Sequence, residues 1–158
     1  MPKYDDASWH YGGDFPKELP PENGATHIGF FLTWCIDNGL VSDFQLEESG
    51  EDVQRVKGRQ ITGRDFLLQN CDEKFTDEDL NDLGNSFAQD YYQEEGTFAE
   101  QHADYLSDYQ TAFDILNQEL DTKLESIYHI EDSVEVYEGI KIILDERFKQ
   151  WKAFAGIA

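Results

Sequence analysis

Residues 25–38 read ATHIGFFLTWCIDN, and this stretch decides the class of fold that the sequence predicts. Its apolar residues recur at intervals of three and four, the spacing of one apolar stripe along an α-helix. The stripe consists of Ile28, Phe31, Leu32, Cys35 and Ile36. The Asn38-Gly39 dipeptide is typical of a helix end. We therefore expect a helix from about Ala25 to Asn38.

Two large side chains of this helix, Phe30 and Trp34, lie off the stripe. They are expected to face a second layer of the fold, the N-terminal arm or a partner. Helical spacing recurs farther along the chain, with Thr62 and Asp65 as a capping box at the start of ITGRDFLLQNC. Further helices are expected from Thr76 to about Gly96, from about Thr97 to Leu120 and from about Ser133 to Phe154.

The remaining segments complete a mainly α prediction. Residues 40–61 fit two short helices, and the only candidate strands are VSDFQL (41–46) and SIYHI (126–130). We predict a single-domain bundle of about five or six helices over residues 1–158. Residues 1–24, which contain all four prolines, form an ordered, loop-rich N-terminal arm, and residues 25–158 form the helical body.

The charge balance is strongly acidic, with 34 Asp and Glu against 12 Lys and Arg and a net charge of -22. Between Asp72 and Glu138 there are 20 acidic residues and two basic ones, Lys74 and Lys123. Such a surface repels nucleic acid and anionic membranes, which attract Lys and Arg. The expected partners are basic proteins or cations. A small basic island, RVKGRQITGR (55–64), is expected to neutralise part of the acidic segment within the fold.

Localisation is predicted to be cytoplasmic. The N-terminus has no apolar signal region, and no apolar run approaches the length of a membrane span. Cys35 and Cys71 are far apart without a CxxC spacing, as expected for free thiols in a reducing compartment. Cys35 lies on the apolar stripe, and anions beside Cys71 raise the pKa of its thiol, so neither is predicted to be a nucleophile.

The sequence predicts no cofactor and no metal site. Asp77, Asp79 and Asn81 match the first ligands of an EF-hand loop, but Asp82 stands where glycine is required and Ala88 where glutamate is required. No HExxH or ExxH pattern occurs, and His27 and His129 have no ligand-like neighbours at helical spacing. They are expected to be surface or hydrogen-bonded core histidines.

The stretch SWHYGGDFP, residues 8–16, leaves three interpretations open. It could form a catalytic loop, in which His10 pairs with Asp14 or Asp6 for acid–base chemistry. It could instead pin the arm onto the helices through Trp9, Tyr11 and Phe15, or it could dock a partner through the same aromatic residues. No nucleophile, oxyanion site or metal accompanies the catalytic interpretation.

Three stretches, YDDASWHYGGDFP, ATHIGFFLTW and TGRDFLLQNCDEKFTDEDLNDLGNSFAQDYY, resemble a family of uncharacterised bacterial proteins. That family is a domain of unknown function with a similar Tyr-Asp-Asp-Ala-x-Trp-His opening. The resemblance covers most of the chain and implies no catalytic residues. Proteins of this kind are similar in size and acidity to the immunity proteins of bacterial toxin systems, which is an analogy of character rather than of motif.

The leading functional hypothesis is an immunity protein, not an enzyme, that neutralises a bacterial toxin with a basic cleft, such as a nuclease. Alternatives are an enzyme with a site at His10 and Asp14, and an acidic regulatory protein that mimics nucleic acid; the acidity could also serve solubility alone. The aromatic anchors would be Trp9, Tyr11, Phe15 and Trp34, with Asp14 beside them. The charge would come from Asp77, Glu78, Asp79, Asp82, Asp90, Glu94, Glu95, Glu100, Asp104 and Asp108.

Overall fold

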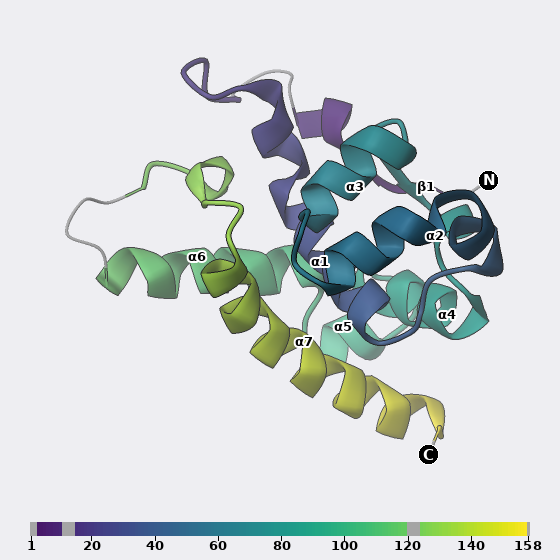
Figure 1. Ribbon diagram of the computed structural model, residues 1–158. Helices are drawn as coiled ribbons and strands as arrows, with labels where there is room; N and C mark the ends of the chain where they lie inside the picture. The colour runs from purple at the N-terminus through teal and green to yellow at the C-terminus, as the bar shows by residue number, and fades with distance from the viewer. Residues whose placement is uncertain (1–2, 11–14, 120–123, 158) are drawn as a thin grey trace.

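The computed structural model describes residues 3–10, 15–119 and 124–157, and these residues form a mainly α fold (Figure 1). The helices are α1 (Thr26–Asp37), α2 (Asp43–Lys57), α3 (Gly63–Asn70), α4 (Asp82–Tyr91), α5 (Phe98–Gln101), α6 (Tyr105–Glu119) and α7 (Val134–Ala155). A two-stranded antiparallel sheet joins β1 (Lys3–Asp6) to β2 (Lys74–Thr76). Four 3-10 turns span Ala7–His10, Pro21–Ala25, Asp77–Asp79 and Ile127–His129.

Helix α1 confirms the helix predicted for residues 25–38, but it is buried on every side rather than along one stripe. All residues from Thr26 to Ile36 are buried. Helices α2, α3 and α7 contact it, and α1 lies between them near the centre of the molecule (Figure 1). Trp34 is therefore not a partner anchor: it is fully buried, and its Nε1 donates a hydrogen bond to Asp145 at 2.9 Å.

Two glycines let the backbones of α1 and α3 touch. A Cβ atom on Gly29 would lie 2.4 Å from the backbone nitrogen of Arg64, and one on Gly63 would lie 2.1 Å from the carbonyl oxygen of Gly29. Both distances are far below van der Waals contact, so any side chain at either position would push the helices apart. The close crossing explains why α3, although short, makes extensive contact with α1.

We predict that Gly63→Ala lowers the free energy of unfolding by about 3 kcal/mol, because the new methyl group overlaps backbone that cannot move away cheaply. The control is Gly139→Ala in α7, where a Cβ meets no atom within 4 Å. Alanine there improves helix propensity and is expected to stabilise the protein by about 0.5–1 kcal/mol. Urea unfolding of both variants tests the pair, and equal effects of the two substitutions would contradict the close crossing.

The core is built from aromatic rings that contact one another, contributed by several helices and a strand. The ring of Phe31, on α1, lies 5.1–6.3 Å from six other aromatic rings. Those rings belong to Trp34, Phe75, Phe87, Tyr91, Tyr92 and Tyr105. Large aromatic side chains bury much apolar surface and prefer such offset and edge-to-face contacts. One ring on the central helix thus connects β2, α4 and α6.

The N-terminal arm is part of this core because β1 pairs with β2. The register places Asp5 opposite Phe75 and Asp6 opposite Lys74, with an irregularity between Lys3 and Asp5. Bulges of this kind bend a strand and redirect its side chains. Tyr4 and Ala7 are buried, so the arm is held by residues at its start.

The prediction that aromatic residues 9, 11 and 15 pin the arm is wrong for Trp9, whose side chain is 58% exposed. Phe15 does pack on the fold, with its ring 5.0 Å from that of Tyr128. Tyr11 and Asp14 lie outside the described residues. Trp9 therefore stays available to a partner, while Phe15 is a packing residue.

Neither predicted strand forms in the described part of the chain. Val41 makes only an isolated bridge to Leu80, after which the Ser42 side chain caps α2. In the second segment Ser126 caps a 3-10 turn. Serine side chains that accept backbone N–H groups favour helix starts over strands. Residues 40–61 do contain two helical pieces: they form the two parts of α2, which is kinked where the backbone of Ser49 is not helical.

The capping box of Thr62 and Asp65 and the Ser133 cap of α7 are confirmed. The middle helices differ from the prediction because local caps interrupt them. Thr76 caps only a 3-10 turn, and α4 begins at a second cap, Asn81. The helix expected from Thr97 to Leu120 is split into α5 and α6, and the second piece is started by Asp104, which accepts hydrogen bonds from Ser107.

The basic island is used inside the fold, as expected, although most of its partners lie outside the acidic segment. Arg55 pairs with Asp52 and Arg59 with Asp37. Only Arg64 pairs with a residue of that segment, Asp132. Among the helices of the described ranges, none is both long and apolar enough to cross a membrane.

Candidate functional site

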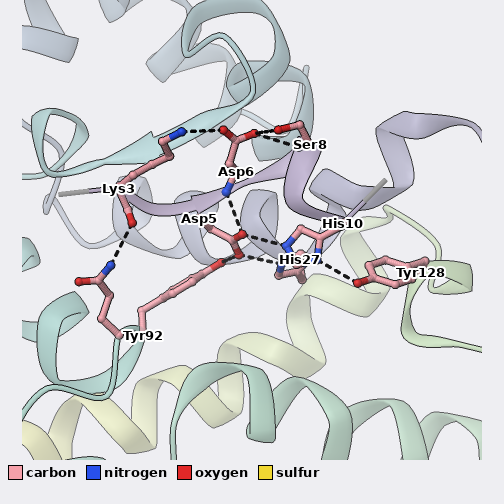
Figure 2. A network of polar contacts seen from close by, with 9 residues as sticks. Lys3, Asp5, Asp6, Ser8, His10, His27, Tyr92 and Tyr128 are labelled. Carbon is pink, nitrogen blue, oxygen red and sulfur yellow. Dashed lines mark hydrogen bonds and ion pairs between the residues drawn. The ribbon is translucent and has the colours of Figure 1, made fainter. Parts of the chain in front are cut away.

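A buried carboxylate at the end of β1 is the centre of a polar network (Figure 2). Asp5 is 3% exposed and accepts four hydrogen bonds. His10 Nε2 donates to its Oδ1 at 2.8 Å and His27 Nε2 to its Oδ2 at 2.9 Å. The hydroxyl of Tyr92 donates to Oδ2 at 2.5 Å and the backbone nitrogen of Asp6 to Oδ1 at 2.8 Å. We call Asp5, His10, His27, Tyr92 and Tyr128 the Asp5 network.

Four separate segments bring these side chains together: residues 5–10, the first turn of α1, the end of α4 and the 3-10 turn that contains Tyr128. Asp5 comes from β1, and the 3-10 turn after it returns His10 toward the same carboxylate. His27 comes from the first turn of the buried helix α1, while Tyr92 ends α4. The strand separates neighbours: Asp5 points to the histidines, and Asp6 points away to Lys3 and Ser8 (Figure 2).

The network favours an ionised Asp5. Burial alone raises the pKa of the Asp5 carboxyl, but the hydrogen bonds and positive charge of His27 and His10 outweigh it and hold that pKa well below its usual range. Burial lowers the pKa of His27, against the hydrogen bond that its ring donates to Asp5, which raises that pKa. Burial and the negative charge of Asp5 raise the pKa of Tyr92 far above its usual value, so its hydroxyl stays a donor.

His10 also meets a fifth residue and the surface. Its Nδ1 lies 2.9 Å from the hydroxyl of Tyr128. Because Asp5 only accepts hydrogen bonds, His10 Nε2 carries a proton, and in the neutral ring Tyr128 donates to Nδ1. His10 and Asp5 line a depression of about 480 Å³, which Trp9, Tyr92 and Leu106 also line.

The network has two chemical capabilities. The order Asp5, His10, Tyr128 is the order in which a carboxylate orients a histidine that then takes a proton from a hydroxyl. In addition, Asp5, His10 and His27 each offer a metal-ligand atom, and these atoms lie within 4.8 Å of one another. Glu18, Glu125 and His129 offer a second, mainly exposed group of this kind.

The acid–base pair that the sequence predicted is replaced by another. His10 bonds to Asp5, not to Asp6, which instead accepts hydrogen bonds from Lys3 and Ser8. Asp14 lies outside the described residues. The sequence analysis missed Asp5, His27, Tyr92 and Tyr128. Only the Asp5–His10 spacing within one short stretch could have indicated a pair.

We predict that Tyr92→Phe lowers the free energy of unfolding by about 2 kcal/mol, because a hydrogen bond to a buried charge is lost. The control is Tyr4→Phe, which removes an equally long hydrogen bond to a neutral acceptor, Asn85 Oδ1. It is expected to cost about 1 kcal/mol. Chemical denaturation measures both, and a Tyr92 variant no less stable than the Tyr4 variant would show that the carboxylate does not depend on this phenol.

Residues 3–130 match the family described as Domain of unknown function (DUF7832). The chain belongs to this family. The matched region contains every residue of the Asp5 network and ends before α7. No curated protein and no solved structure matches the chain.

The acidic segment of this DUF7832 chain presents many carboxylates to solvent. Half of the ten acidic residues predicted to supply charge are exposed, namely Glu78, Asp82, Glu94, Glu95 and Glu100. Asp77, Asp90 and Asp104 are half-buried, and Asp90 accepts a hydrogen bond from Trp151. The exposed five make no ion pair within the described residues.

Two of the predicted surface charges are structural instead. Asp108 is buried and accepts hydrogen bonds from Arg147 and Tyr91. Asp79 is also buried, where it accepts from the backbone of Thr76 and from Gln45 Nε2 at 2.7 Å. Both were predicted to supply charge to a partner, and their burial makes them part of the fold instead.

The environment of Asp79 fits a neutral group better than a charge. Burial raises the pKa of its carboxyl, and the hydrogen bonds from Thr76 and Gln45 only partly oppose this. Gln45 Oε1 is buried and has no hydrogen-bond partner among the described residues. A neutral donor at position 79 could reach that oxygen once the Gln45 amide is turned over.

We therefore predict that Asp79→Asn is at least as stable as the parent at pH 7. The folded protein binds the Asp79 proton more tightly than the unfolded chain, so the parent loses stability as pH rises from about 4 through the raised pKa. The asparagine variant lacks this loss, and its advantage should grow over that pH range. Thermal unfolding at several pH values measures the difference.

The control for this prediction is Asp79→Ala, which removes both the titrating carboxyl and the cap of Thr76, so at each pH it should be about 1 kcal/mol less stable than the asparagine variant. An asparagine variant whose stability relative to the parent falls from pH 4 to pH 7 would mean that the fold favours a charged Asp79.

Proposed function

We propose that this protein binds a basic partner protein, as an immunity protein that neutralises a toxin with a cationic cleft. The single observation that supports this proposal is the unequal use of charge. The sequence has 12 Lys and Arg residues, and in the part of the chain that the structure describes seven of them form ion pairs with the protein's own carboxylates. The exposed carboxylates between Asp72 and Glu138 thus keep most of their negative charge for the surroundings.

Free surface charge of one sign has a defined physical effect. It steers an oppositely charged protein during diffusion and raises the association rate by one to three orders of magnitude at low salt. A nuclease cleft built for phosphates is a surface of the required sign. Occupation of that cleft by carboxylates would exclude the substrate.

The depression next to the Asp5 network supplies a candidate contact point. Trp9 is 58% exposed there, beside Glu94, Glu95 and the partly exposed Leu106. Tryptophan is a common interface anchor, and a rim of charged residues around it is typical of binding surfaces. The combination supports a role in protein binding over a role in solubility alone, since solubility needs no exposed aromatic side chain.

We predict that reversing Asp82, Glu94, Glu95 and Glu100 to lysine slows association with the partner at least tenfold at low salt. The partner would first be captured from cells of the source organism with the tagged parental protein and eluted with a salt gradient. Surface plasmon resonance with the purified partner then gives the rates. The loss should shrink as salt rises, because screening weakens steering.

The matched control reverses four exposed acidic residues of α2, namely Asp43, Glu47, Glu48 and Glu51. It changes the net charge equally at another part of the surface, so association should be much less affected. Equal slowing by both variants would mean that total charge matters and no binding surface exists there. A captured partner that is a DNA-binding regulator rather than a toxin would favour mimicry of nucleic acid, and toxicity rescue by co-expression separates the two.

A further inference from the structure

We propose that Asp5, His10 and His27 bind one divalent transition-metal ion, a site independent of the acidic surface. One carboxylate and two imidazoles form a donor set suited to zinc or to non-haem iron. Their ligand atoms already lie within 4.8 Å of one another. Both imidazoles direct Nε2, the atom that would bind the ion, toward the same carboxylate.

The distances between these atoms are close to those of a bound site. Zinc lies about 2.0–2.2 Å from nitrogen and oxygen ligands, so two donors on one tetrahedral ion are roughly 3.3 Å apart. The separations from the Asp5 oxygens to His10 Nε2 and His27 Nε2 are 2.8 and 2.9 Å. An ion would need the rings to move back by about half an ångström, and the proton on each Nε2 would move to Nδ1 of the same ring.

The charge around Asp5 also suits a cation. No Lys or Arg of the described ranges forms an ion pair with this buried carboxylate, since Lys3, the nearest in sequence, pairs with Asp6 instead. Buried charges are normally paired or coordinate metal ions. A divalent ion between Asp5 and two histidines would supply that balance.

Outer hydrogen bonds hold the proposed ligands in place. Tyr92 donates to Asp5 Oδ2, and Tyr128 contacts His10 Nδ1, the ring nitrogen that would not bind the ion. Tyr105 donates to the backbone carbonyl of His27. Metal-binding histidines and carboxylates usually have such supporting partners, which fix the ring orientation and raise affinity.

An ion also has a route to the site and a free coordination position. His10 and Asp5 line the depression, and Glu94 and Glu95 stand on its rim, where they attract cations. Three protein ligands leave a fourth position for water or a small ligand, the arrangement of catalytic rather than purely structural zinc sites.

The test uses the full chain, without an affinity tag and stripped with a chelator. Isothermal titration with Zn²⁺ at pH 7.5, in buffers of different ionisation enthalpy, gives affinity, stoichiometry and proton release. We expect one ion per chain and little proton release, because each neutral imidazole keeps its proton when that proton moves from Nε2 to Nδ1. Co²⁺ should give the visible absorption of a site with nitrogen and oxygen ligands.

Two variants decide which residues bind. His10→Gln keeps a side chain that can still donate to Asp5, and because His10 is at the edge of the core the protein should fold; zinc affinity should fall at least tenfold. His27→Gln should do the same if it folds. The control, His129→Gln, disrupts the group of Glu18, Glu125 and His129 and should leave zinc binding unchanged.

Three results would overturn the proposal: no zinc or cobalt binding by the parent, parental affinity in the His10 variant, or loss of binding in the His129 variant alone. In each of these cases the Asp5 network is a structural hydrogen-bond network, while the proposed binding of a basic partner is unaffected.

Discussion

Every residue of α1 from Thr26 to Ile36 is buried, so the rest of the chain has to cover this one helix on all sides. A helix with water on one side would need only an apolar stripe, but a fully enclosed helix must also find partners for its polar side chains. Gly29 helps to enclose α1 by letting the backbone of α3 approach directly. His27 is a polar side chain of α1, and its imidazole requires a hydrogen-bond partner in the core. The N-terminal strand brings that partner, Asp5, and so the arm becomes part of the core.

The chain separates its charges into two populations. Those inside the fold are matched group by group: Asp5 with two histidines, Asp108 with Arg147, and Asp37 with Arg59. Those outside are left mostly negative. Because a buried charge without a partner is costly whereas an exposed carboxylate costs little, the basic residues contribute most to stability where they meet buried acids. The surface charge that remains is therefore a property the fold does not need, and it is free to act on other molecules.

The helices were largely predictable from sequence, and the site was not. Periodicity and caps located α1, the start of α3 at Thr62 and the start of α7 at Ser133, because these signals lie within a few residues of one another. The same logic missed the breaks before Asn81 and at His102, where a second cap competes with an otherwise continuous helical pattern. Trp34 was left between a second layer of the fold and a partner, and its contacts with Asp145 and Phe148 of α7 correspond to the second layer. The Asp5 network escaped prediction for a different reason: its hydrogen bonds join residues up to 118 positions apart, and no local spacing relates His10 to Tyr128.

Those separations also fix the order in which the molecule can be completed during synthesis. Strand β1 is made some seventy residues before β2, its pairing partner, and Tyr92 is made later still. Contacts between distant segments form slowly because a long loop must be closed before they gain anything. Until Tyr92, at the end of α4, has emerged, Asp5 lacks the hydrogen bond from its hydroxyl. Until Tyr128 has emerged, His10 Nδ1 lacks the contact with the Tyr128 hydroxyl. The residues of β1 thus wait for most of the chain before they reach their final environment, and a nascent chain truncated before α4 would leave the apolar helix α1 exposed to water.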